Sequence, residues 1–224
     1  MNCNIKQFFS SSIGKKYIMG LTGLALCGFL VTHLLGNLLL LMGPDAFNLY
    51  AHTLTSNPLI YVAEAILLLI FLSHLGLATK ISLENRAARP VKYYAHHATG
   101  RGMTFSSKTM PLSGLVTFVF VVLHLLNFKY GTQYLTNVDG QEMRDVFKTV
   151  IEYFENPLYV VWYVFAMCVL GFHVCHGFQS AFQSLGFNHP KYTPLIKLKA
   201  KAFGLFVTIG FSGLAIWCHF QGGQ

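Results

Sequence analysis

Residues 156–186 read NPLYVVWYVFAMCVLGFHVCHGFQSAFQSLG, and this stretch decides the fold class. It has no aspartate, glutamate, lysine or arginine, and its two histidines, His173 and His176, lie among Val, Leu and Phe side chains. About 20 apolar residues are enough to cross a bilayer. Because an ionisable side chain inside a membrane span is costly, it is a candidate functional residue there. The stretch therefore predicts a membrane helix with a functional histidine.

The composition of the whole chain agrees with a membrane protein. Hydrophobic residues make up 54% of it, charged residues only 11%, and the mean hydropathy is +0.50, far from the balance of a soluble domain. We therefore predict an all-α integral membrane protein, a bundle of five transmembrane helices forming a single domain over residues 1–224. The expected spans are residues 17–42, 58–79, 110–128, 157–185 and 202–220.

The net charge of +8 is distributed unevenly between the two sides of these spans. If the N-terminus is cytoplasmic, only Lys129, Arg144 and Lys148 lie outside, and thirteen of the sixteen basic residues lie inside. The positive-inside rule thus predicts a cytoplasmic N-terminus and an external C-terminus. Because topology explains the basic residues, we do not expect nucleic-acid binding. The inside residues are Lys6, Lys15, Lys16, Lys80, Arg86, Arg89, Lys92, Arg101, Lys108, Lys191, Lys197, Lys199 and Lys201.

Two of the intramembrane histidines share an outer depth. His33 lies 17 residues after Lys16. His124 lies 16 residues after Lys108. At 1.5 Å per residue, both are roughly 25 Å from the inner charged boundary.

Two others share an inner depth. His74 lies 16 residues after Pro58. His173 lies 16 residues after Pro157, and each of these prolines follows an asparagine. Both histidines are therefore roughly 24 Å from the outer boundary.

Four histidines on four helices, paired at two depths, are what two bis-histidine haems require, because each iron takes one imidazole on either side of the porphyrin. A single intramembrane histidine is more often a helix-to-helix hydrogen bond, but the matched depths favour haem. Zinc fits less well, since two ligands per layer do not complete a tetrahedral site. The chain has no CxxCH motif for covalent haem attachment.

Several motifs together resemble a known family. The chain is similar to the cytochrome b membrane anchor of succinate:quinone oxidoreductase (succinate dehydrogenase) and quinol:fumarate reductase, in the five-helix, dihaem form in which a single chain makes up the anchor. The similarity covers nearly the whole chain and is weakest at residues 129–155. The motifs are SIGKKYIMGLTG (12–23), THLLGN (32–37), SHLGLATK (73–80), VLHLL (122–126) and GFHVCHGFQSAFQSLG (171–186).

The resemblance implies two b haems, with His33 and His124 on the outer, distal one and His74 and His173 on the inner, proximal one. It implies a multi-pass protein of the bacterial cytoplasmic (inner) membrane, in the respiratory chain and the tricarboxylic acid cycle. A flavoprotein with covalent FAD and an iron–sulfur protein would dock on the cytoplasmic face. Electrons from succinate would pass through iron–sulfur clusters and both haems to a quinone, most often menaquinone, and fumarate reduction would reverse the flow. The flavoprotein would hold the catalytic residues for succinate.

Four other positions carry hypotheses. Some dihaem relatives have a glutamate two residues before the span-four ligand, but this chain has Gly171, which puts proton transfer by that route in doubt. Glu64 is a candidate for quinone protonation or a haem propionate network, or else an interfacial residue. Asn37 is a candidate quinone contact, or else a helix-packing amide. Depth matching assigns the ligand role to His173, and His176, one turn further inward, is a candidate neighbour of the haem propionates.

Two other classes of function remain open from the residues. One is a dihaem cytochrome b of a hydrogenase or formate dehydrogenase, which uses the same coordination chemistry with another soluble partner. The other is a haem-free membrane scaffold or transporter whose histidines pack or relay protons. The sequence also leaves open whether the whole complex forms an oligomer.

Overall fold

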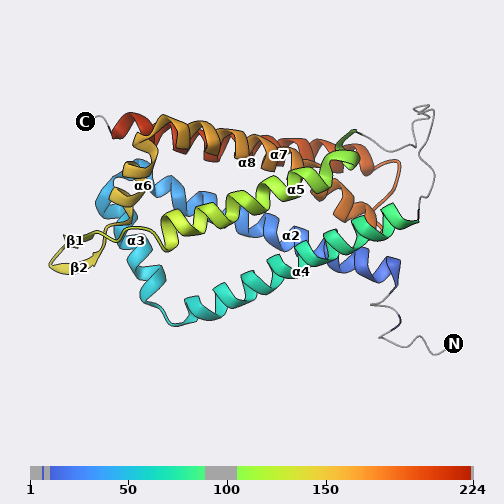
Figure 1. Cartoon of the computed structure of the whole chain (residues 1–224), viewed down its shortest axis with the longest axis horizontal. Coiled ribbons are helices and arrows are strands. Elements are labelled where there is room, and N and C mark those ends of the chain that lie inside the picture. The colour runs from blue at the N-terminus through green and yellow to red at the C-terminus, as the bar shows by residue number, and fades with distance from the viewer. Residues whose placement is uncertain (1–6, 8–10, 89–104, 223–224) are drawn as a thin grey trace.

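Five long helices dominate the computed structural model, which describes residues 7, 11–88 and 105–222 (Figure 1). All five are long and apolar enough to cross a membrane, so the predicted all-α membrane bundle is confirmed. They are α2 (Ser12–Asn37), α4 (Leu59–Ala87), α5 (Phe105–His124), α7 (Pro157–Ser184) and α8 (Thr193–Gln221), with α2 continuing as the 3-10 segment η1 (Leu38–Met42) and α5 as the π-helical segment η2 (Leu125–Lys129).

Local sequence signals explain where these helices begin. The Ser11 hydroxyl accepts a hydrogen bond from the Gly14 N–H at 3.0 Å and caps α2. The Asn156 side chain accepts one from the Leu158 N–H at 3.0 Å, and Pro157 occupies the first turn of α7. The first N–H groups of a helix have no partner within the helix. Ser11 and Asn156 each accept a hydrogen bond from one such group, and Pro157 has no N–H to leave unpaired.

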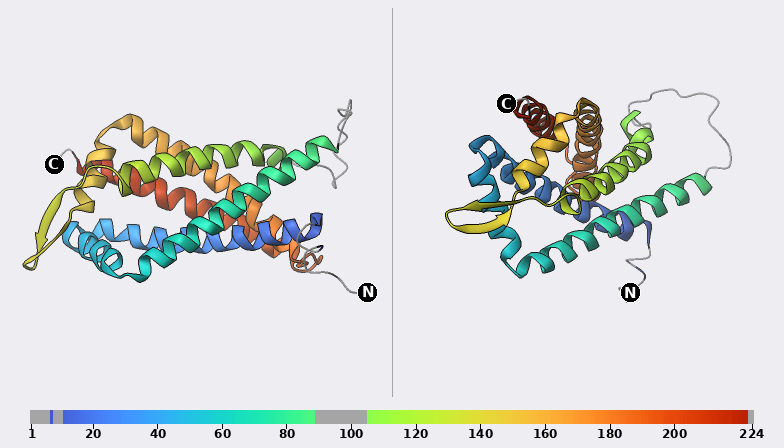
Figure 2. Two further views of the ribbon diagram at one scale, coloured as in Figure 1. Left: turned by 60° about the horizontal axis from the view of Figure 1, so that its bottom comes forward. Right: turned by 60° about the vertical axis from the view of Figure 1, so that its left-hand side comes forward.

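The helices pack unequally. α7 and α8 lie side by side along much of their length, α2 packs on α7, and α5 packs on the other flank of α7 (Figure 2). α4 packs chiefly against α2 and only slightly against α5. None of the α4 residues, all of which the structure describes, is buried. α4 is thus splayed away from the rest of the bundle.

Two glycines allow the close contact between α7 and α8. A Cβ on Gly204 of α8 would lie 2.6 Å from the Gly171 carbonyl oxygen of α7. A Cβ on Gly171 would lie 2.8 Å from the Gly204 carbonyl oxygen and would clash with the Thr208 hydroxyl. Small residues let membrane helices approach closely. Position 171 therefore has no room for the glutamate found in some relatives.

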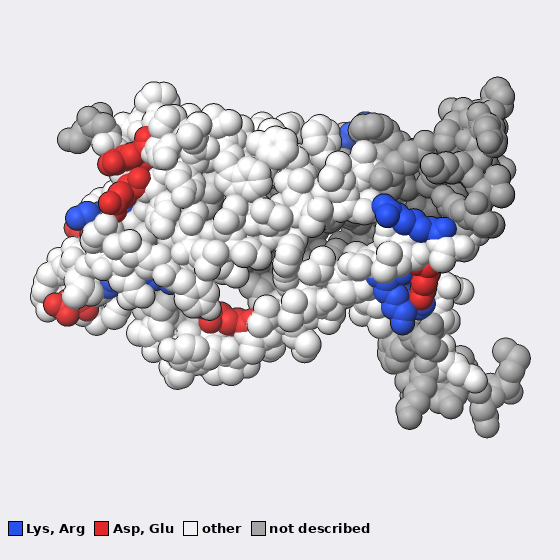
Figure 3. Space-filling model, viewed as in Figure 1, with Lys and Arg blue, Asp and Glu red and all other residues white. Residues whose placement is uncertain are grey.

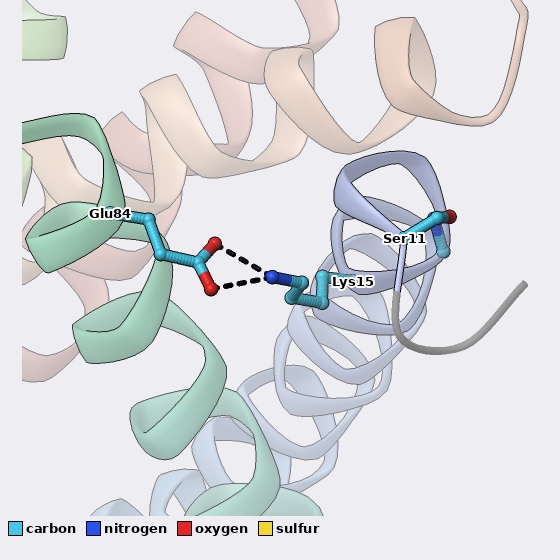
Figure 4. Close-up of polar contacts among 4 residues, drawn as sticks. Ser11, Lys15 and Glu84 are labelled. Atoms are coloured by element: carbon cyan, nitrogen blue, oxygen red, sulfur yellow. Dashed lines mark hydrogen bonds and ion pairs between the residues drawn. The ribbon is translucent and has the colours of Figure 1, made fainter. Parts of the chain in front are cut away.

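A partly buried ion pair joins the start of α2 to the end of α4. The Lys15 ammonium group lies 2.6 Å and 2.7 Å from the two carboxylate oxygens of Glu84 (Figure 4). The Lys15 side chain is only 9% exposed, whereas that of Glu84 is 45% exposed. The pair therefore fixes α4 against α2 at this end of the bundle.

The opposite end carries structure that the spans do not include. The connection between the first two spans is the helix α3 (Pro44–Ser56). The segment 129–155 mixes charged and aromatic residues, which predicts an amphipathic surface helix. It contains the helix α6 (Val146–Glu155) and also a hairpin of β1 (Leu135–Val138) and β2 (Gln141–Arg144). Asp139 and Gly140 form its two-residue turn with φ angles of 53° and 80°. An Asp-Gly pair is a strong hairpin signal.

Charge separates the two ends (Figure 3). Lys15, Lys80 and Arg86 lie at the end where α2 begins and α4 finishes, which we call the basic end. Most acidic side chains lie at the other end, near the hairpin, which we call the hairpin end. α2 begins and α8 finishes at opposite ends of the bundle (Figure 1). Of the basic residues expected inside, Lys6, Arg89, Lys92, Arg101 and the Lys108 side chain lie outside the described part of the chain.

Candidate functional site

His33 and His124 form a pair between α2 and α5. Their ring centroids are 5.8 Å apart and their ring planes are at 84°. With metal–nitrogen bonds of about 2 Å, two imidazoles on opposite sides of one metal ion have centroids about 6 Å apart. The separation of this pair is therefore close to the one that a bis-histidine iron requires.

Aromatic side chains surround this pair. Phe120 and Phe128 lie 5.6 Å and 5.2 Å from His124 by ring centroids, and Phe29 stacks on His33 at 5.2 Å. The Tyr163 hydroxyl lies 3.3 Å from Nδ1 of His124. The pair thus has an apolar, aromatic environment that suits a flat hydrophobic ligand.

Asn37 lies one helical turn beyond His33. Its side-chain amide donates a hydrogen bond to the His33 carbonyl oxygen at 2.8 Å and is 3.5 Å from the His33 Nε2. The amide is therefore adjacent to the imidazole edge as well as bonded to its own helix. A quinone contact by Asn37 stays a prediction.

His74 of α4 and His173 of α7 are the second pair predicted from the sequence, and both are half-buried. Nδ1 of His74 lies 3.2 Å from the Thr22 hydroxyl of α2. Nδ1 of His173 lies 3.0 Å from the Ser113 hydroxyl of α5. In both cases Nδ1 has a partner on a neighbouring helix, and Nε2 is the nitrogen left for a ligand.

The two pairs lie at different levels of the bundle. Thr22, which contacts His74, precedes His33 by eleven residues on α2. Ser113 and His124 have the same spacing on α5. Eleven residues correspond to about 16 Å along a helix. The His74–His173 pair is accordingly about 16 Å closer to the basic end on both helices.

His176 is the second histidine of the stretch that opens the sequence. It is half-buried and lies one turn from His173 towards the basic end. This position agrees with a neighbour of the His74–His173 level. Its role stays a prediction.

Glu64, the other candidate for proton transfer, has an ion-pair partner. Its carboxylate contacts the ammonium group of Lys129 in η2, and 42% of the Glu64 side chain is exposed. The ion pair joins α4 to the end of α5 near the hairpin end. An exposed, paired carboxylate matches the interfacial interpretation more closely than a buried proton carrier, and a role in quinone protonation stays a prediction.

The donor set fits haem better than a bare metal ion. Within the described residues, no group of three or more His, Cys, Asp or Glu side chains is arranged to hold a metal ion. Two imidazoles are enough for a haem iron, because the porphyrin provides the other four nitrogens. The splayed α4 also leaves the surface hollowed between α4 and α5, as Figure 3 shows. The His33–His124 pair therefore fits a b haem, and His74 and His173, whose Nε2 atoms are free for a ligand, are candidates to bind a second one.

Sequence reasoning found the histidines but missed the groups that contact their Nδ1 atoms. Thr22, Ser113 and Tyr163 are ordinary residues of apolar helices when read singly. A usable signal was nevertheless present: Thr22-Gly23 precedes His33, and Ser113-Gly114 precedes His124, each by the same spacing. Identical spacing on two helices is consistent with equivalent positions relative to the histidine layers.

Comparison with known proteins identifies the family but does not include all four histidines, because His33 and His74 lie outside the matched segment. Residues 82–211, more than half of the chain, match a family described as succinate dehydrogenase/fumarate reductase transmembrane subunit. The matched segment includes His124 and His173. No curated protein and no solved structure matched the chain. The chain therefore belongs to the family of succinate dehydrogenase/fumarate reductase transmembrane subunits.

Proposed function

We propose that the chain is the dihaem cytochrome b anchor of a succinate:quinone oxidoreductase, conducting electrons between an iron–sulfur partner and membrane quinone. His33 and His124 would bind a distal b haem, and His74 and His173 a proximal one. Family membership supports the complex. The proposal of two haems is based on the two pairs of histidines, because each haem iron takes two of them.

The 5.8 Å separation of the His33 and His124 rings carries the proposal. These residues come from helices that are far apart in the sequence, and nothing in ordinary helix packing requires two imidazoles to meet. His74 and His173 contact Thr22 and Ser113, which lie about 16 Å further along the bundle, and they offer a second candidate pair of ligands. The repetition favours two cofactors of the same kind.

Two b haems would provide one-electron redox chemistry at two levels of the membrane. The chain's own residues would hold each haem from two helices, and the aromatic side chains around His33 and His124 would exclude water from the distal one. Oxidation of succinate to fumarate in the flavoprotein would release two electrons and two protons. Reduction of a quinone to a quinol would consume two electrons and two protons.

The basic end would face the cytoplasm and receive the partners. Lys15, Lys16, Lys80 and Arg86 lie there, as the positive-inside rule requires. The His74–His173 level is the nearer one, so it would exchange electrons with the iron–sulfur protein, while the FAD-bearing flavoprotein lies beyond. The quinone, menaquinone by the family resemblance, would react near the distal level. The membrane would be the bacterial cytoplasmic membrane.

Co-purification tests the identity of the complex. A tagged chain isolated from native membranes in mild detergent should retain a partner protein whose flavin survives denaturation, and should reduce a quinone analogue when succinate is added. A partner containing nickel or molybdenum and no covalent flavin would contradict the proposal. That result would favour a hydrogenase or formate dehydrogenase cytochrome instead.

A further inference from the structure

We propose that Thr22 and Ser113 are positioning residues that hold the two proximal histidines in the tautomer whose Nε2 lone pair is free to bind iron. This inference rests on the proposed function, since it concerns the same histidines. It assigns a role to two hydroxyl groups, one on α2 and one on α5. The tautomer of each histidine follows from where the single proton of the neighbouring hydroxyl points.

The Thr22 hydroxyl donates its proton to a backbone carbonyl oxygen of its own helix, α2. Its hydroxyl lies 2.8 Å from the Ile18 carbonyl oxygen and 3.1 Å from that of Met19, and carbonyls only accept. The hydroxyl can therefore only accept from Nδ1 of His74, 3.2 Å away. Acceptance requires a proton on Nδ1. In a neutral imidazole this leaves the lone pair on Nε2.

Ser113 repeats the arrangement on the other side of the bundle. Its hydroxyl donates to the Met110 carbonyl oxygen at 3.0 Å. It lies 3.0 Å from Nδ1 of His173 and must accept the proton there. His173 thus has the same tautomer as His74. Both Nε2 atoms are available as ligands.

A glycine follows each hydroxyl residue and brings the imidazole close. A Cβ on Gly23 would lie 3.1 Å from Cε1 of His74, and one on Gly114 would lie 3.5 Å from Cε1 of His173. On α2, Thr22 and Gly23 therefore contact His74 of α4. On α5, Ser113 and Gly114 contact His173 of α7 in the same way.

The distal level is built differently. His124 meets a phenol, the Tyr163 hydroxyl, at 3.3 Å, and His33 has the amide of Asn37 near its Nε2. A hydrogen bond from Nδ1–H to an acceptor makes the imidazole a stronger electron donor and favours oxidised iron. Removing either hydroxyl should therefore raise the midpoint potential of the proximal haem alone.

The experiment is an optical redox titration of the purified whole complex carrying Thr22→Val or Ser113→Ala. Thr22→Ser keeps the hydroxyl and should titrate like the unmodified protein. Thr117→Val is the matched control, because the Thr117 hydroxyl bonds only to the Ser113 carbonyl oxygen among the described residues. We expect each hydroxyl-free variant to change the ratio of reduced to oxidised proximal haem at a fixed potential by roughly fivefold, with the distal component unchanged.

Specific loss of the proximal haem in Thr22→Val and Ser113→Ala, with retention in Thr22→Ser, would also support the assignment. Unchanged titrations of both components, or equal shifts of both, would overturn it and leave the dihaem proposal intact. Absence of b-type absorbance from the unmodified complex would instead contradict the proposed function itself. Failure of the inference about Thr22 and Ser113 and failure of the proposed function therefore give different results.

Discussion

The Lys15 ammonium group contacts both carboxylate oxygens of Glu84, and this ion pair joins the start of α2 to the end of α4 (Figure 4). The contact lies at the basic end, beyond the Thr22–His74 contact between the same two helices. Because α4 has no buried residue and packs mainly on α2, this ion pair and the Thr22 contact both help to place His74. The ion pair is thus a structural support of the proximal level.

Breaking the ion pair from either side should give unequal effects. Glu84→Gln leaves the buried Lys15 charge without a partner, which we expect to destabilise the complex by about 1–2 kcal/mol after allowance for the exposure of Glu84. Lys15→Met should cost less, because it replaces the buried cation with an apolar chain of similar length. Thermal unfolding measures both, with the exposed Lys16→Met as control. Equal stability of Glu84→Gln and the unmodified protein would contradict the role.

The glycine contact between α7 and α8 makes a second prediction. Gly171→Ala would place a methyl group against the Gly204 carbonyl oxygen and the Thr208 hydroxyl, and should destabilise the bundle by about 1–3 kcal/mol. A Cβ on Gly177 would meet no other described atom within 4 Å. Gly177→Ala in the same helix should therefore be neutral or slightly stabilising. A thermal scan in which both variants behave alike would refute the packing argument.

The two histidines of α7 should differ in their effects. His173→Ala should abolish the proximal haem, because it removes one of the two ligands of that iron. His176→Ala should only perturb this haem, since His176 lies one turn away. Haem content and the potential of the proximal component distinguish the two variants. The opposite pattern would transfer the ligand role to His176.

Glu64 offers a test of proton transfer. If its carboxylate delivers protons to quinone, Glu64→Gln should slow quinone reduction and change its pH dependence. Lys129→Met is the matched control, because it breaks the same ion pair but keeps the carboxylate. Unchanged activity and pH dependence in Glu64→Gln would leave Glu64 as an interfacial residue.

The sequence predicted the bundle because twenty-residue apolar runs leave few alternatives, and it paired His33 with His124 because depth in a membrane follows residue count. It could not predict that Thr22 meets His74, since that contact depends on the rotation of α2 about its axis. The ion pair of Glu64 with Lys129 likewise depends on how the α5 end and α4 converge. The hairpin at Asp139 and Gly140 is not among the elements predicted from the sequence, although an Asp-Gly pair is a strong signal for a hairpin turn.

Optical redox titration of the complex with single His→Ala variants tests the central claim most directly. The unmodified protein should contain two b haems per chain and titrate as two components. His33→Ala and His124→Ala should lose one and the same component, whereas His74→Ala and His173→Ala should lose the other. Loss of different components within a pair, or no b-type absorbance in the unmodified protein made with sufficient haem, would contradict the account.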